Sequence, residues 1–278
     1  MSLIYRRIVF YLLFIAFIIS APLITAYTAG YRYSFTQKRI VKIGALSIDS
    51  FPRGVAIIIN GEPITNTTPT LLTNLIPGRY TITLKNEGYY EWTKTLNVES
   101  ERTTFAHDIP LFKINTPVLI NTTVDFPATT SVSSFNQYKV FHENKQNKIV
   151  VIDNNTQKRL LELPGTQAFW HEKPEPLFFV ASANEIWQWT PRNNKTTLIT
   201  RLSDEILTVL SPPRLNALML VQKNRVQALE LDLRDQQNRW DLAAFEQIKT
   251  AALSGDGSKL FISGKREDKE GLFELILF

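Results

Sequence analysis

The stretch IVFYLLFIAFIISAPLITAYTA, from Ile8 to Ala29, decides how this chain is built. No charged residue lies between Arg7 and Arg32. As an α-helix at roughly 1.5 Å per residue, this stretch would extend ~33 Å, which is enough to cross a hydrocarbon core of ~30 Å. The sequence therefore predicts a transmembrane helix over about residues 8–29.

A cleaved signal peptide is the alternative to a permanent anchor. Signal peptides combine a basic start with an apolar run of roughly 7–15 residues and a small-x-small cleavage site. Arg6 and Arg7 supply the basic start, but the apolar run is too long and Ala26-x-Thr28 is a poor cleavage site. We therefore expect an uncleaved signal anchor, followed by a basic juxtamembrane linker that ends near residue 43.

Charge patterning bears on both the membrane orientation and the class of partner. Residues 1–43 hold six cations and no anion, residues 44–108 hold five cations and seven anions, and the remainder holds twenty cations and nineteen anions. The net charge of +5 therefore belongs to the membrane-proximal segment, and the rest lacks the basic cluster of a nucleic-acid-binding domain. A positive-inside count favours a cytoplasmic C-terminal side. A short N-terminal tail followed by a long all-β region favours the extracytoplasmic side, and we predict that orientation.

Short alternating runs separated by turn residues begin after the linker. Val55–Ile59 is a β-branched, apolar run that ends at Asn60-Gly61, a pair that favours the positive φ angles of a hairpin turn. The alternation in Tyr80–Leu84 places its three apolar residues on one face of a strand. Strands at this spacing predict a small antiparallel β-sandwich over residues 44–112.

The turn residues of this region follow a definite order. They are Ser50-x-Pro52-x-Gly54, Asn60-Gly61, Thr68-Pro69, Leu75-x-Pro77-Gly78-x-Tyr80 and Gly88-Tyr89. This order, over residues 44–100, resembles the PEGA domain, a small β-fold of surface-associated bacterial and archaeal proteins. The naming tetrapeptide reads Pro52-Arg53-Gly54-Val55, so its second and fourth positions depart from the family name. The resemblance implies an extracytoplasmic structural or interaction role and supplies no catalytic residue.

From about Ser131 onward the chain repeats weakly at roughly 40 residues. Each unit has a turn, an apolar strand, a polar turn and a second strand; the first strands fall at 135–141, 177–180, 218–221 and 260–262, and the second at 149–152, 185–189, 226–231 and 272–278. Such spacing is typical of propeller blades. The Ser-Gly-Asp-Gly-Ser turn at 254–258 resembles the turn of WD40-like and TolB-like propeller repeats.

These repeats predict a β-propeller-like domain over residues 113–278. About four or more blade-like meanders would form a four-bladed ring or an open arc, or Ile109–Val124 would complete another blade; the sequence leaves these alternatives open. The whole chain is predicted to be all-β apart from one N-terminal transmembrane helix.

No set of residues is arranged for chemistry. His107, His142 and His171 are scattered without metal-ligand spacing, so we expect surface histidines and no metal site. Asp256-Gly257 lacks the ligand ladder of a calcium loop and predicts a hairpin turn. The polar stretch from Asp232 to Asp241 is typical of an inter-strand loop.

Four tryptophans, Trp170, Trp187, Trp189 and Trp240, could stack on sugars, but aromatic residues in such repeats are more often propeller core. We therefore predict a membrane-anchored, extracytoplasmic scaffold or binding module of a bacterial cell envelope. Its expected partners are the membrane and an envelope protein or polysaccharide, with no nucleic acid, cofactor, metal or catalytic residue. The alternative is a hydrolase of cell-wall material or polysaccharide acting at the propeller mouth through a carboxylate such as Asp204 or Glu205.

Overall fold

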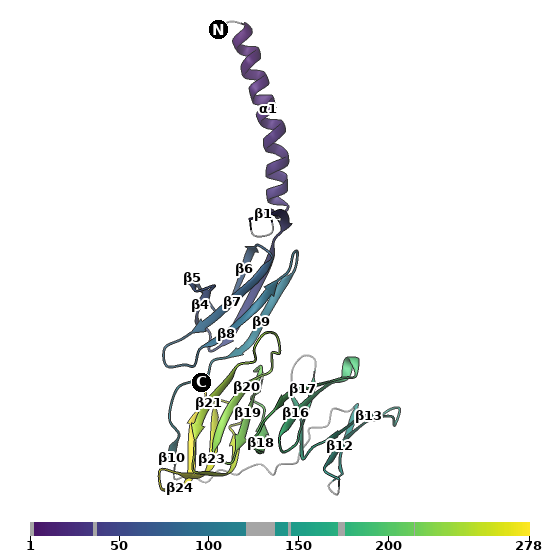
Figure 1. Cartoon of the computed structure of the whole chain (residues 1–278), viewed down its shortest axis with the longest axis vertical. Helices are drawn as coiled ribbons and strands as arrows, with labels where there is room; N and C mark the ends of the chain where they lie inside the picture. Colours follow the sequence, from purple (N-terminus) through teal and green to yellow (C-terminus); the bar gives the residue numbers. More distant parts are fainter. Residues whose placement is uncertain (1–2, 36–37, 121–136, 144–145, 172–175, 214) are drawn as a thin grey trace.

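The described chain consists of one long helix followed, at its C-terminal end, by a region of β-strands (Figure 1). The computed structural model describes residues 3–35, 38–120, 137–143, 146–171, 176–213 and 215–278. Helix α1 (Leu3–Thr28) has its side chains exposed almost throughout, and Ile4–Thr28 is long and apolar enough to cross a membrane. The helix begins five residues before the predicted start because Arg6 and Arg7 are good helix formers.

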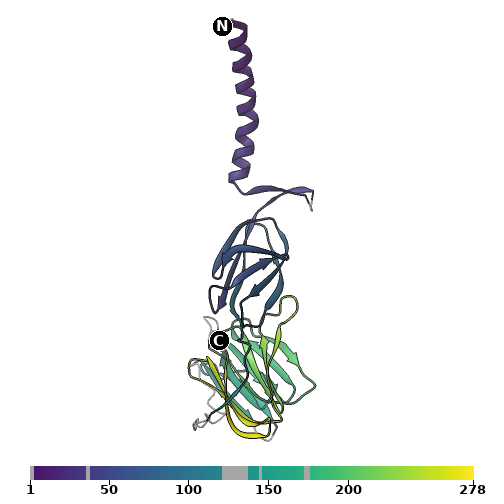
Figure 2. The same cartoon turned by 90° about the vertical axis from the view of Figure 1, so that its left-hand side faces the viewer.

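Residues 31–42, predicted to be a linker, form a β-hairpin instead. Strand β1 (Tyr31–Ser34) pairs antiparallel with β2 (Arg39–Lys42), and no other strand among the described residues pairs with them. The backbone N–H of Ile43 donates to the Gly30 carbonyl, so the hairpin closes at the foot of the helix. Figure 2 shows it running sideways from the helix end.

Residues 44–110 form a sandwich of two sheets. The strands are β3 (Gly44–Phe51), β4 (Ala56–Ile59), β5 (Glu62–Thr67), β6 (Thr70–Leu75), β7 (Gly78–Lys85), β8 (Trp92–Val98) and β9 (Thr103–Pro110), in the orders β6-β3-β9 and β5-β4-β7-β8. Burial alternates along β3 and β8, as period-2 patterning requires. One pair departs from the predicted antiparallel arrangement, because β3 and β9 are parallel. Alternation fixes which face of a strand is buried, but not which strand lies beside it or in which direction.

The predicted turn at Asn60-Gly61 is confirmed. Both residues have positive φ, 51° and 86°, and they join Ile59 to its partner Glu62 in the β4–β5 hairpin. The Asn60 side chain also accepts a hydrogen bond from the Thr81 backbone N–H at 2.9 Å, which ties the turn to β7.

The described part of the C-terminal region forms four further sheets, one after another. Their strands are β10 (Val118–Ile120), β11 (Tyr138–Glu143), β12 (Lys148–Asp153), β13 (Arg159–Pro164), β14 (Gln167–His171), β15 (Leu177–Ala181), β16 (Glu185–Thr190), β17 (Lys195–Arg201), β18 (Ile206–Leu210), β19 (Ala217–Gln222), β20 (Arg225–Glu230), β21 (Arg239–Ala244), β22 (Gln247–Leu253), β23 (Lys259–Arg266) and β24 (Lys269–Ile276). The sheets are β11-β12-β13, β14–β17, β18–β21 and β10-β24-β23-β22. A single-turn 3₁₀ helix, η1 (Pro191–Asn193), links β16 to β17.

These four sheets form an open, propeller-like arc. The sheets of β11–β13 and of β22–β24 lie at its opposite ends (Figure 1). Strand β10 pairs with β24, so the segment after the sandwich completes the last sheet and adds no separate blade among the described residues. The prediction of an all-β chain with one N-terminal apolar helix is confirmed.

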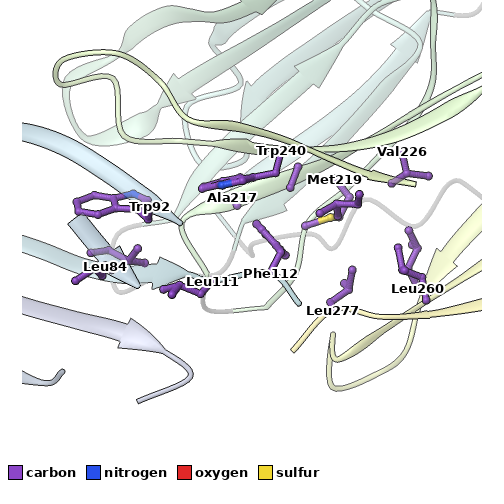
Figure 3. Packing of buried hydrophobic residues seen from close by; sticks show 14 of the residues in the cluster. Leu84, Trp92, Leu111, Phe112, Ala217, Met219, Val226, Trp240, Leu260 and Leu277 are labelled. Carbon is purple, nitrogen blue, oxygen red and sulfur yellow. The ribbon is translucent and has the colours of Figure 1, made fainter. Parts of the chain in front are cut away.

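The sandwich and the near end of the arc share one hydrophobic core. Leu84, Trp92, Leu111 and Phe112 belong to the same buried cluster as Ala217, Met219, Trp240, Leu260 and Leu277 (Figure 3). Leu111 and Phe112 are fully buried and lie in the connection between the two regions. The far end of the arc has separate clusters, one between the β14–β17 and β18–β21 sheets and one between the β11–β13 and β14–β17 sheets.

Candidate functional site

A buried ion pair lies where the sandwich meets the arc. The Lys94 Nζ atom lies 2.8 Å from the Glu230 Oε2 atom, and the two side chains are 0% and 2% exposed. The Trp92 Nε1–H donates to Glu230 Oε1 at 2.8 Å, and Lys94 also donates to the Asp232 carbonyl at 2.7 Å. A charged pair this deep is tolerated only when its remaining hydrogen-bonding groups are satisfied, so these contacts act as one unit.

The sequence analysis did not single out this pair, although a signal was present. In the run Trp92-Thr93-Lys94-Thr95-Leu96 the lysine occupies an inward-facing position of the alternation, between two buried apolar residues. Glu230 likewise ends a strand whose preceding residues are buried. A charged residue at a core position predicts a buried partner, but the sequence does not say which residue that partner is.

Asp232 and Arg234 form a second, more accessible group in the loop between β20 and β21. The guanidinium donates through Nε and Nη2 to the Asp232 carboxylate, at 2.9 Å and 2.6 Å, and Nη2 also donates to the Phe105 carbonyl of β9. Burial of Asp232 opposes its ionisation. The hydrogen bonds from Arg234 and the nearby Lys94 charge outweigh burial and hold the pKa of Asp232 below its ordinary value.

The inter-strand loop predicted over Asp232–Asp241 ends earlier, because β21 begins at Arg239. The loop also has a second role, since it covers the outer edge of β8. Asp235 Oδ2 accepts from the Thr95 backbone N–H at 2.8 Å, and Asn238 Nδ2 donates to the Thr93 carbonyl at 3.1 Å. Strand β8 is the last strand of its sheet, so these side chains satisfy backbone groups that would otherwise be open to another strand.

We call the contact between the sandwich and the arc around Lys94 and Glu230 the joint. A cavity of about 320 Å³ opens beside it. It mixes charged, amide and apolar side chains from both regions: Trp92, Ala106, His107, Ile109, Leu177, Gln188, Asn216, Glu230, Leu231, Asp232, Leu233 and Arg234. A second hollow of about 540 Å³ runs along β8 and β9, and Arg234 lines both. Volumes of this size fall in the range of small-molecule sites. The cavity beside the joint is the candidate functional site.

Two of the three histidines contact a serine, which the sequence did not predict. His107, which lines the cavity, has its Nε2 atom 2.7 Å from Ser47 Oγ across the β3–β9 pair. His171 is buried, contrary to its prediction as a surface residue, and its Nδ1 lies 2.6 Å from Ser211 Oγ. The parallel pairing of β3 with β9 and the packing of one arc sheet on the next bring these residues together.

Most of the remaining candidates are structural. Trp170, Trp189 and Trp240 are buried in the core clusters, whereas Trp187 is half-buried and donates to Glu185. The Ser254–Ser258 turn joins β22 to β23, and its hydrogen bonds, first from the Ser254 hydroxyl, lower the pKa of Asp256 to about 2. The predicted hairpin turn at Asp256-Gly257 is thus confirmed.

The carboxylates named for a hydrolase do not lie at the cavity. Asp204 forms an ion pair with Arg225, Glu205 is exposed, and neither lines the cavity beside the joint. Within the described ranges, no group of three or more histidine, aspartate or glutamate side chains could hold a metal ion.

The β-sandwich region matches a known domain family. Residues 43–113 match the PEGA domain family, which agrees with the order of turn residues and with the extent of the two-sheet sandwich. A comparison with curated proteins finds no match.

Solved structures show a distant likeness in the arrangement of sheets. Hsv2 of Kluyveromyces lactis is 11% identical over 80% of this chain and 70% of its own, with a TM-score of 0.36. A chain of a mitotic checkpoint complex is 10% identical over 71% of each chain, with a TM-score of 0.40. The extracellular domain of a hybrid two-component system, BT4673 of B. thetaiotaomicron, is 11% identical over 88% of this chain and 31% of its own, with a TM-score of 0.38.

Proposed function

We propose that this protein is a membrane-anchored binding module of a bacterial cell envelope, with its β-region outside the cytoplasmic membrane. The observation that carries this proposal is the arrangement along the chain: an exposed apolar helix, a PEGA-type sandwich, and a propeller-like arc fused to the sandwich through one core. The arc cannot swing freely relative to the sandwich, because separating the two regions would expose Leu111, Phe112 and the Lys94–Glu230 pair.

The ligand is an envelope protein or a polysaccharide, held without chemistry. The cavity beside the joint suits polar recognition because Arg234 and Asp232 present a charged pair, and Gln188 and Asn216 present amides. Asn216 is already engaged by backbone contacts with Asp108 and Leu231, which fixes its position. Polar groups that are already fixed in position lose less conformational entropy on binding than groups on a mobile surface, and this favours affinity.

Two measurements test location. Protease added to intact spheroplasts is expected to remove everything beyond Lys42 while cytoplasmic controls survive, and N-terminal sequencing of the membrane-extracted protein is expected to begin at the start of the chain. Protection of the β-region from protease would show that it faces the cytoplasm. A mature N-terminus after residue 20 would show that the apolar segment is a cleaved signal peptide and not an anchor.

Binding is tested at the cavity with a matched pair of variants. Arg234→Gln removes the charge shared by the two hollows, whereas Arg192→Gln removes a charge from η1, away from the joint. On arrays of envelope glycans and peptidoglycan fragments, we expect retention of the purified protein to fall at least tenfold for Arg234→Gln only. Equal retention of both variants would place the ligand elsewhere.

A hydrolase is the second candidate, because Ser47 and His107 have the spacing of a nucleophile and its base, and His107 lines the cavity. The hydrogen bonds of the described residues add no carboxylate to orient His107, which a serine nucleophile ordinarily needs. A fluorophosphonate probe separates the two functions: labelling that disappears in Ser47→Ala would establish an enzyme, and the binding module predicts no labelling.

A further inference from the structure

Strand β9 ends its sheet of the sandwich, and one of its two edges is open. Among the described strands it pairs only with β3 (Figure 1). Natural edge strands are commonly blocked by lysine, by proline or by a covering loop. The stretch from Thr103 to His107, ~16 Å long at about 3.3 Å per residue, contains neither lysine nor proline. The edge of β8, by contrast, is covered by the loop that carries Asp235 and Asn238.

The β3–β9 register shows which backbone groups of β9 face away from β3. Ala45 pairs with Thr103 in parallel, and the Ala45 N–H donates to the Arg102 carbonyl at 3.0 Å. In a parallel pair, alternate residues of a strand bond to its neighbour. Thr104 therefore bonds to β3, and the backbone groups of Thr103 and Phe105 point to the open edge.

One of these outward groups has a partner. The Phe105 carbonyl accepts from Arg234 Nη2 at 2.8 Å, in agreement with its outward direction. No described residue forms a hydrogen bond with the Phe105 N–H, or with the N–H and carbonyl of Thr103. Two donors and one acceptor are thus placed where another strand would bond.

The second hollow, of about 540 Å³, opens beside the same edge. Leu96 of β8 and Thr104 of β9 line it, and the Thr104 hydroxyl donates to the Asn97 carbonyl at 2.9 Å between the two strands. A residue of an added strand that shares the face of Thr104 would direct its side chain into this hollow. The next residue would lie beside the Phe105 ring, which is 55% exposed.

We infer that the open edge of β9 binds an extended peptide segment of an envelope protein as an added, parallel strand. This deepens the proposed function by naming the class of ligand, and rests on it for the envelope origin of the peptide. A parallel strand uses the Thr103 carbonyl and the Phe105 N–H through a single peptide residue and leaves the Phe105 carbonyl to Arg234. An antiparallel strand would need both Phe105 groups and would displace Arg234.

A peptide is the matching ligand because its backbone supplies N–H and carbonyl groups at the spacing of the edge, which a glycan does not. Its side chains alternate between the two faces of the added strand. The residue beside Phe105 is therefore apolar, and the residue before it fills the hollow.

Peptide selection with the full-length protein tests the inference. Protein in nanodiscs is presented with a phage library of linear 12-residue peptides, and empty discs serve for counter-selection. The selected peptides are then measured on two variants. Phe105→Pro removes the outward N–H without removing a bond to β3, because the Phe105 N–H faces away from that strand. Phe105→Val, which keeps the N–H, is the matched control.

We expect the selected peptides to bind Phe105→Pro at least tenfold more weakly than the wild type, and Phe105→Val within threefold of it, with equal thermal melts. N-methylation of the peptide residue that donates to the Thr103 carbonyl should weaken binding at least tenfold, whereas N-methylation of either neighbour should weaken it less than threefold. Hydrogen exchange of the Phe105 amide should slow at least tenfold on binding, and exchange of the Thr104 amide should stay constant.

The inference is overturned if no peptide is enriched over empty discs, or if the enriched peptides bind Phe105→Pro as tightly as the wild type. Should Phe105→Pro melt early, the other two measurements decide, and tolerance of N-methylation at every position or unchanged exchange at Phe105 overturns it. A failure of the proposed function is distinguishable. A β-region that is protected in spheroplasts would leave the selection unchanged, and retention on glycan arrays without any selected peptide would remove the added strand alone.

Discussion

The two ends of the β-region are held together in different ways. At the end nearer helix α1, the sandwich and the last two sheets of the arc share one core, closed by the buried Lys94–Glu230 pair. At the distal end, each sheet packs on the next through its own smaller cluster, and a lysine–glutamate pair such as Lys148–Glu162 lies at the surface. Removing one partner of a lysine–glutamate pair should therefore change the free energy of unfolding strongly at the first end and little at the second. Water is excluded from the first pair and screens the charges of the second.

Glu230→Ala is expected to have the largest effect. It leaves the Lys94 charge buried without its carboxylate and should cost about 3–5 kcal/mol in the free energy of unfolding. Urea melts of the detergent-solubilised protein measure it. The double variant Lys94→Met with Glu230→Met should recover most of the loss, and a double variant as unstable as Glu230→Ala would mean that packing, not the unpaired charge, dominates at the joint.

Gly61→Val is expected to come next. It forces a β-branched residue to φ near 86° and should cost about 1–3 kcal/mol. A Cβ at Gly61 would meet no atom within 4 Å, so the loss comes from the backbone alone. Gly255→Val is the matched control, since that glycine is equally open and lacks a positive φ. The full chain is needed, because residues 44–112 alone would expose Leu111 and Phe112; equal melts for the two variants would contradict the turn assignment.

Acid is expected to weaken the joint between the sandwich and the arc. The pKa of Asp232 is depressed in the folded protein, so its contribution to stability is present above the ordinary aspartate pKa and is lost as the pH falls through the lower, folded value. Tryptophan fluorescence during acid titration should change in the wild type below about pH 4. Asp232→Asn should flatten that step, and an unchanged titration would mean that other carboxylates control acid unfolding.

Lys148→Ala is expected to have the smallest effect. Its pair with Glu162 is 2.8 Å long but more than a third exposed on both sides, so solvent already compensates each charge. The thermal midpoint should stay within the scatter of replicate melts, far from the loss at Glu230→Ala. A comparable loss at both sites would erase the distinction between the two ends of the molecule.

Several features follow from local sequence. The uncharged run after Arg7 forms a helix, the Asn60-Gly61 pair forms a turn with both φ angles positive, and the β3 alternation buries the expected face. Residues 43–113 match the PEGA family that the turn order suggested. Each depends on interactions within a few residues, which a sequence displays directly.

Other features depended on contacts between distant segments. The sequence did not show that β3 pairs in parallel with β9, that β10 completes the last sheet, or that Lys94 meets Glu230. It also did not show that Ser47 lies beside His107, or that β1 and β2 pair as a hairpin. Alternation and turn residues set the strands and their buried faces, but the partner of a strand or a buried charge is selected by the packing of the whole chain, so only the tertiary structure decided it.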